Sequence, residues 1–159
     1  PGGWVQVARE RVGPGGVVVG IDLQEVEPVA GAVLLQGDFL AEDGPERLSQ
    51  ALGGPADAVL SDMAAPATGH ARTDHLRIIA LAEAALDFAL EVLAPGGAFV
   101  AKVLQGGSER TLLETLRRNF AKVSHVKPPA SRKESAELYV VATGFRGGGT
   151  AQANREEER

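Results

Sequence analysis

Three short apolar segments of this chain each run into an aspartate. These are Val17–Asp22, Gly31–Phe39 with Asp38 near its end, and Ala58–Leu60, which is followed by Ser61 and Asp62. Apolar runs of this length are typical of buried strands in a parallel sheet. Ligands of such sheets bind beyond the carboxyl ends of the strands. We therefore predict that the three acids converge on one sheet edge and suit a ligand with several hydroxyl, amine or amide donors.

Helical segments alternate with these strands. The glycine pair Gly2–Gly3 leads into the first helix; the expected helices are Trp4–Val12, Glu42–Leu52, about Asp74–Leu93, and Ser108–Asn119 with Ser108 as N-cap. The apolar stripe expected on the long helix is Leu76, Ile79, Ala80, Leu86 and Leu90. The remaining strands are Ala98–Leu104, Lys122–Lys127 and Ala136–Thr143, the last two joined only by the loop Pro128–Glu134. This order predicts an α/β fold, a doubly wound and mostly parallel sheet with a C-terminal antiparallel hairpin.

The chain is expected to form one domain over residues 1–146, followed by a disordered polar tail over residues 147–159. It begins with Pro1-Gly2-Gly3-Trp4, without a methionine and without a preceding strand. A glycine pair that opens a helix normally follows a strand. We therefore expect that the first strand and the segment before it are missing.

Composition narrows the class of protein. Hydrophobic residues make up 44% and charged residues 23% of the 159 residues, which is typical of a globular domain. There is no apolar run of membrane-spanning length, so no membrane association is expected. The absence of cysteine excludes disulfides and thiolate metal sites and fits a cytoplasmic protein. The histidines, His70, His75 and His125, lack metal-ligand spacing, so we expect surface or loop positions and no metal.

Charge is distributed unevenly along the chain. The net charge is −5, but Lys102–Lys133 contains eight basic and two acidic residues, a local charge of +6. A solvated helix face explains some of this excess, and a surface that contacts nucleic-acid phosphates explains it as well. The candidate phosphate contacts are Arg117, Arg118, Lys122, Lys127, Arg132 and Lys133.

Three residues are candidates for a site on positional grounds alone. Asp22 ends what would be the second strand of a nucleotide-binding unit, where an acid usually binds ribose hydroxyls; the alternative is a turn residue. Asp62 follows a strand end and is either a site acid or the cap of a loop. Lys102 lies in an otherwise apolar strand, which is costly unless the ammonium is paired or reaches solvent at the sheet edge. Its natural partners are the strand-end carboxylates.

Six motifs in order resemble the FtsJ/RlmE family of S-adenosylmethionine-dependent ribosomal RNA 2′-O-methyltransferases. They are PGGW at the N-terminus, Asp22, QGDF at Gln36–Phe39, LSDMAAP at Leu60–Pro66, KVLQG at Lys102–Gly106 and SAELYVVATG at Ser135–Gly144. The resemblance covers the chain to Phe145. It implies a Rossmann-like class I methyltransferase fold and a substrate in large-subunit (23S) ribosomal RNA.

The resemblance also implies roles for individual residues. Gly2 and Trp4 would belong to the loop that binds the methionine part of S-adenosylmethionine, and Asp38 with Phe39 would bind the adenine. Asp62 would lie near the methionine part and the reacting centre. Asp62, Lys102 and Glu137 match three members of the family's catalytic Lys-Asp-Lys-Glu set, and the first lysine would lie upstream of residue 1.

The set makes chemical sense, because a ribose 2′-hydroxyl is a poor nucleophile that must be aligned and deprotonated. Lys102 is the candidate base, although neighbouring carboxylates favour its charged form, so it is also expected to orient the hydroxyl. Three alternatives stay open: methylation of transfer RNA or another RNA, a dinucleotide-binding oxidoreductase, and a binding module without catalysis. The oxidoreductase suits Asp22, but PGGW lacks the GxGxxG pattern. The protein is expected to be a monomer.

Overall fold

The computed structural model describes residues 2–106 and 109–147. Two compact units divide the chain, residues 1–55 and residues 56–159, and each is described by itself. Two sequence predictions concern residues outside the described part, namely Ser108 as an N-cap and the polar tail beyond Gly147. None of the described helices is long and apolar enough to cross a membrane.

The N-terminal unit contains two parallel strands and two helices. Its elements are α1 (Gly3–Val12), β1 (Val18–Asp22), β2 (Ala32–Gln36) and α2 (Gly44–Leu52). β1 and β2 pair in register from Val18 opposite Ala32 to Asp22 opposite Gln36, and both helices contact β1. The alternation predicted from the sequence is wrong at one point, because the described connection between β1 and β2 contains no helix.

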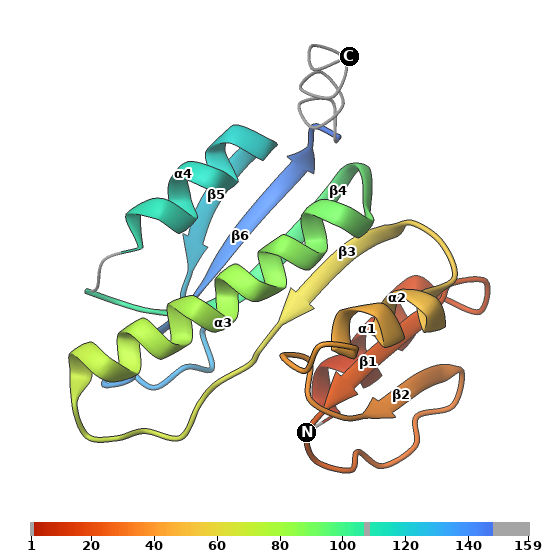
Figure 1. Cartoon of the computed structure of the whole chain (residues 1–159), viewed down its shortest axis with the longest axis horizontal. Coiled ribbons are helices and arrows are strands. Elements are labelled where there is room, and N and C mark those ends of the chain that lie inside the picture. Colours follow the sequence, from red (N-terminus) through yellow and green to blue (C-terminus); the bar gives the residue numbers. More distant parts are fainter. Residues whose placement is uncertain (1, 107–108, 148–159) are drawn as a thin grey trace. The chain divides into compact units, whose positions relative to one another are not determined.

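The C-terminal unit is a four-stranded mixed sheet with two helices. Its elements are β3 (Ala56–Ser61), α3 (Ala71–Val92), β4 (Leu93–Leu104), α4 (Arg110–Asn119), β5 (Phe120–Val126) and β6 (Glu137–Phe145). The strand order is β3-β4-β6-β5; β3 and β4 are parallel, and β6 is antiparallel to both its neighbours. The predicted C-terminal hairpin is therefore confirmed, with its last strand inserted beside β4 (Figure 1).

One face of this sheet forms the core. Because side chains alternate between faces along a strand, Phe99, Ala101 and Val103 of β4 share a face with Val140 and Ala142 of β6, and all five are fully buried. Both helices lie over this face (Figure 1). The helix residues buried against it include Ile78, Ile79, Ala82, Leu86 and Ala89 of α3 and Leu112 and Leu116 of α4.

The opposite face of the same sheet is only half-buried. It carries Val100 and Lys102 of β4, which pair with Val141 and Tyr139 of β6. Leu60 of β3 pairs with Val100 and is 48% exposed. The prediction that Ala58–Leu60 is a buried strand is therefore wrong for Ala58 and Leu60, which are exposed, because β3 is an edge strand of this sheet and both residues face away from the helices. This open face carries the candidate site.

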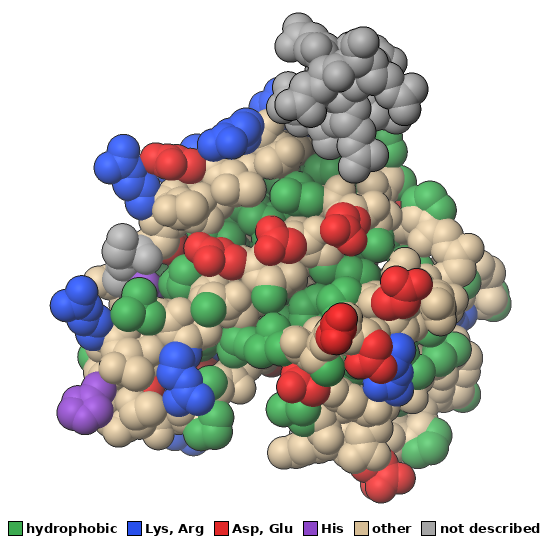
Figure 2. Space-filling model, viewed as in Figure 1, with side chains coloured by type: hydrophobic (Ala, Val, Ile, Leu, Met, Phe, Trp, Pro, Cys, Tyr) green, Lys and Arg blue, Asp and Glu red, His purple; other side chains and the backbone are tan. Residues whose placement is uncertain are grey.

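The long helix differs in detail from its prediction. α3 begins at Ala71 rather than Asp74, and two of its predicted core residues, Leu76 and Ala80, are exposed. His75 is 8% exposed and belongs to the buried stripe, so its predicted surface position is wrong. α3 packs the side that carries His75, Ile78, Ile79 and Ala82 against the sheet. This buried side is rotated about the helix axis relative to the predicted stripe, which included Leu76. Acidic side chains follow the visible side of α3 (Figure 2).

Candidate active site

Three elements of the C-terminal unit bring Asp62, Lys102 and Glu137 to one sheet edge. Asp62 follows Ser61, the last residue of β3, which pairs with Ala101 of β4. Lys102 is the next residue of β4, and Glu137 begins β6 opposite Leu104. Because β3 and β4 are parallel and β6 runs back against β4, two strands end and one begins at this edge. The family resemblance implied that these three residues form one set, and the structure brings them together.

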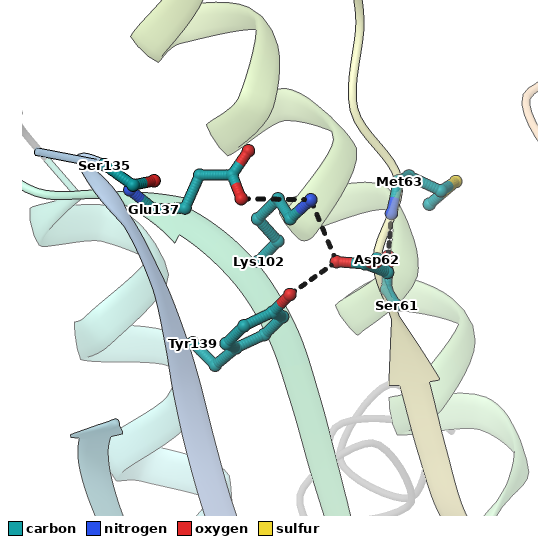
Figure 3. A network of polar contacts seen from close by, with 7 residues as sticks. All are labelled: Ser61, Asp62, Met63, Lys102, Ser135, Glu137 and Tyr139. Atoms are coloured by element: carbon teal, nitrogen blue, oxygen red, sulfur yellow. Dashed lines mark hydrogen bonds and ion pairs between the residues drawn. The ribbon is translucent and has the colours of Figure 1, made fainter. Parts of the chain in front are cut away.

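The ammonium of Lys102 is held between two carboxylates (Figure 3). Its Nζ lies 3.0 Å from Asp62 Oδ1 and 3.5 Å from Glu137 Oε2. The Lys102 side chain is 11% exposed, whereas those of Asp62 and Glu137 are 43% and 47% exposed. A nearly buried lysine is thus paired, as its position in an apolar strand requires. Two ion pairs leave one N–H direction of the ammonium for a ligand oxygen.

Tyr139 is part of the same network, and the sequence analysis missed it. It lies directly opposite Lys102 across the β4–β6 ladder, and its hydroxyl donates a hydrogen bond of 2.8 Å to Asp62 Oδ1. Burial raises the pKa of Tyr139 well above its ordinary value, and the hydrogen bond and charge of Asp62 raise it further. The signal was present in the sequence: Tyr139 is two residues after Glu137 in a strand, so both side chains share a face.

The N-terminal unit holds the other two strand-end acids. Asp22 ends β1, and Asp38 follows β2 by two residues. Each carboxylate accepts a hydrogen bond from the backbone N–H two residues later, Asp22 from Gln24 at 2.9 Å and Asp38 from Leu40 at 2.8 Å. One oxygen of each side chain is fixed in this way. Within the described part of the chain no hydrogen bond reaches the second oxygen of either acid.

Gly2 lies at the same end of β1. It precedes α1 with a φ of 91°, and a Cβ at Gly2 would come within 2.8 Å of Val26, four residues beyond Asp22. A side chain is excluded both by this contact and by the left-handed backbone. Trp4, in the first turn of α1, is 38% exposed, whereas Phe39 is buried at 9%. The structure thus places Gly2, Asp22 and Asp38 around the carboxyl ends of β1 and β2.

The predicted basic surface separates into two groups. Lys127, Arg132 and Lys133 lie in or next to the loop that joins β5 to β6, at the Glu137 end of the sheet. Lys122 pairs with Thr143, six residues along β6 from Glu137, or about 20 Å away. Arg117 and Arg118 end α4, immediately before β5. The second group therefore lies at the opposite end of the sheet, where basic side chains gather over α4 (Figure 2).

Lys127 has a structural contact that distinguishes it from its neighbours. Its Nζ donates hydrogen bonds to the backbone carbonyls of Lys133, at 3.3 Å, and Ser135, at 2.8 Å. Lys127 thereby closes the loop, while Arg132 and Lys133 are exposed.

Across residues 2–106 and 109–147 there is no group of three or more metal-ligating side chains.

Comparison with known proteins identifies the family. The model of the FtsJ-like methyltransferases matches residues 1–145. The chain belongs to this family. Among curated relatives, ribosomal RNA large subunit methyltransferase E of Paramagnetospirillum magneticum is 68% identical over 152 residues, which are 92% of this chain and 62% of that protein. The protein of the same name from Granulibacter bethesdensis is 64% identical, covering 94% of this chain and 64% of the relative.

A solved structure agrees with this assignment. A crystal structure from Plasmodium falciparum, assigned as a ribosomal RNA methyltransferase, superimposes with a TM-score of 0.71 at 26% identity and covers 82% of this chain and 73% of that chain. The predicted fold class, a Rossmann-like methyltransferase, is confirmed. Membership of the FtsJ-like family decides against the dinucleotide oxidoreductase. The chain spans about three-fifths of the length of the two curated relatives.

Proposed function

We propose that this protein transfers the methyl group of S-adenosylmethionine to a ribose 2′-hydroxyl of large-subunit (23S) ribosomal RNA. The observation that carries the proposal is the nearly buried Lys102 between Asp62 and Glu137 at the sheet edge of an FtsJ-like chain. The names of the relatives support large-subunit ribosomal RNA as the substrate. A binding module without catalysis has no use for a costly buried lysine held by two acids.

The residues of the N-terminal unit fit the cofactor. We assign the free oxygen of Asp22 to the ribose hydroxyls of S-adenosylmethionine, and Asp38 with Phe39 to its adenine. Gly2 and Trp4 open α1, where N–H groups precede the first helical hydrogen bond, from Gln6 to Gly2, and suit the methionine carboxylate. From the family resemblance we assign Asp62 to the methionine part as well as to the reacting centre.

The cofactor, when bound, supplies a methyl group activated by its sulfonium, so transfer to the 2′-oxygen leaves one proton to be removed. We propose that Lys102 Nζ binds the hydroxyl oxygen through the N–H direction that its two ion pairs leave open. Because two ion pairs hold its amino group in place, orientation of the hydroxyl is the first role that we propose for Lys102. A neutral Lys102 accepting the proton is the second role that we propose for it.

We propose that the basic residues bind RNA phosphates, with Arg132 and Lys133 closest to the reacting ribose and Arg117, Arg118, Lys122 and Lys127 extending or shaping the surface. The double reversal Arg132→Glu and Lys133→Glu is expected to weaken RNA binding and to flatten its salt dependence. Each lost phosphate contact reduces the slope of log K against log salt by roughly 0.7 on a single strand. Filter binding at several salt concentrations measures both quantities.

The matched control is Arg11→Glu, which reverses an exposed charge in α1, outside the basic stretch. Arg11→Glu is expected to leave the salt slope unchanged. An unchanged slope in the Arg132→Glu and Lys133→Glu protein would show that this loop does not contact phosphates.

We further propose that the protein is a cytoplasmic monomer. The absence of cysteine from the sequence fits a reducing compartment. Transfer RNA or another RNA is the second candidate substrate, because the 2′-hydroxyl that Lys102 is proposed to bind is present in every ribose. Selection of one nucleotide would then depend on contacts between RNA-binding surfaces and bases, rather than on Asp62, Lys102 and Glu137.

The proposed function is tested by methyl transfer from labelled S-adenosylmethionine, using the protein at its full natural length. Large ribosomal subunits, small subunits and transfer RNA are offered separately. We expect label in 23S RNA, at a nucleotide whose 3′ phosphodiester resists alkaline hydrolysis because its 2′-oxygen is methylated. Label in a base would contradict the proposed chemistry, and label only in transfer RNA would replace the proposed substrate.

The cofactor assignment has its own prediction. Asp22→Ala is expected to weaken S-adenosylmethionine binding by at least about tenfold in calorimetry, since it removes charge-assisted hydrogen bonds to two hydroxyls. The control is Asp87→Ala, which removes an exposed acid of α3. Equal affinities of the two variants would show that Asp22 does not bind the ribose of the cofactor.

A further inference from the structure

Tyr139 shares one acceptor atom with the proposed catalytic lysine. Its hydroxyl donates to Asp62 Oδ1 at 2.8 Å, and Lys102 Nζ contacts the same oxygen at 3.0 Å (Figure 3). Tyr139 and Lys102 are directly opposite on adjacent strands, so their separation is set by the β4–β6 ladder. The two donors therefore reach Asp62 from fixed positions.

Asp62 itself has little else to hold it. It lies outside β3, at the start of an irregular segment that continues to His70, and its side chain is 43% exposed. Ser61 before it is buried, and Ser61 Oγ accepts a long hydrogen bond of 3.5 Å from the Met63 N–H. The backbone is thus anchored, but the carboxylate rotamer depends on Lys102 and Tyr139. Lys102 is also drawn toward Glu137, 3.5 Å away.

We infer that Tyr139 is a positioning residue, which fixes the Asp62 carboxylate and limits its hold on the Lys102 ammonium by sharing Oδ1. The inference rests on the proposed function in assigning Lys102 and Asp62 to methyl transfer. A hydrogen bond to Oδ1 withdraws charge from that oxygen and weakens its ion pair with Lys102. Lys102 is then freer to bind a hydroxyl, and the second oxygen of Asp62 is presented in one direction.

The hydroxyl of Tyr139 keeps its proton and can donate this hydrogen bond in neutral and mildly alkaline solution. Burial, followed by the hydrogen bond and charge of Asp62, raises the pKa of Tyr139, so the phenol stays protonated in neutral and mildly alkaline solution. A phenolate would be repelled by Asp62 and Glu137 and could not donate. In the described C-terminal unit, the ionisable groups facing this position are Asp62 from the segment after β3, Lys102 from β4 and Glu137 from β6.

The first test is a double-mutant cycle in methyl transfer, made with the protein at its full natural length. Tyr139→Phe removes only the hydroxyl and is expected to lower kcat about tenfold, the worth of one charge-assisted hydrogen bond, while the KM for RNA changes less than twofold. In an Asp62→Ala background the same change is expected to have no further effect. Equal losses in both backgrounds would overturn the inference, because Tyr139 would then act without Asp62.

The second test does not require activity. The absorbance of tyrosinate is followed with rising pH, and subtracting the Tyr139→Phe protein from its parent isolates this phenol. Tyr139 is expected to ionise at lower pH in the Asp62→Ala background than with Asp62 present, within the range where circular dichroism shows folded protein. Identical ionisation in both backgrounds would overturn the contact. An inactive parent protein would contradict the proposed function, while this titration would still decide on Tyr139.

Discussion

Lys102→Ala is expected to lower methyl transfer by at least about 10²-fold, and by up to about 10⁴-fold if Lys102 also accepts the proton. The variant removes the cation that pairs with both Asp62 and Glu137 and so the group proposed to orient the hydroxyl. The two carboxylates remain about half-exposed, so the fold is expected to tolerate the change. Single-turnover methyl transfer to large ribosomal subunits measures the effect, and calorimetry checks that S-adenosylmethionine still binds.

The control for Lys102→Ala is Arg11→Ala, which removes an exposed cation from α1, outside the proposed RNA-binding residues. It is expected to leave single-turnover rates at saturating RNA unchanged. Lys102→Arg separates the two roles of the lysine: it keeps the positive charge but cannot accept a proton at ordinary pH. An arginine protein with nearly full activity would reject Lys102 as the base, and a fully active Lys102→Ala protein would reject both roles.

The strands, Asp62 and Lys102 could be predicted from local sequence pattern, whereas Glu137 was predicted from the family resemblance. The run Val17–Asp22 predicts a strand and its end, which the structure gives as Val18–Asp22, although this strand is only half-buried. Ligands bind at the carboxyl ends of parallel strands, so the end of such a run is a candidate site position. Lys102 stood out because a lysine between buried residues needs a partner. Pairing of β4 with β6 is long-range, however, and Tyr139 becomes part of the site only through that pairing.

Two features of the C-terminal unit follow from packing and could not be predicted from the sequence. The sequence distance between Arg117 and Lys133 is short, yet the whole length of β5 separates them, so one basic stretch becomes two groups. His75 was judged by its polarity, but its place on α3 turns it toward the sheet beside Ile78 and Ile79. Burial depends on which side of α3 faces the sheet. Because α3 carries apolar residues on several sides, its sequence alone does not show which side that is.

Phe120→Ala is expected to destabilise the C-terminal unit by about 3–5 kcal/mol, the usual cost of deleting a buried phenylalanine ring. Phe120 is 1% exposed and lies where α4 passes directly into β5. Its ring packs between Phe145, with centroids 5.3 Å apart, and Phe99, at 6.5 Å. The ring thus joins three strands of the sheet, and its loss leaves a cavity that the ladder cannot close. Urea unfolding followed by circular dichroism measures the change.

Val126→Ala provides the comparison on the same strand. Val126 is 43% exposed at the other end of β5, so its truncation is expected to cost less than about 1 kcal/mol. Similar losses in the two variants would mean that the stability of β5 comes from strand pairing rather than from the aromatic core. A large loss confined to Phe120→Ala, with methyl transfer retained below the unfolding transition, would separate the residues that hold the sheet together from those at its open face that carry the reaction.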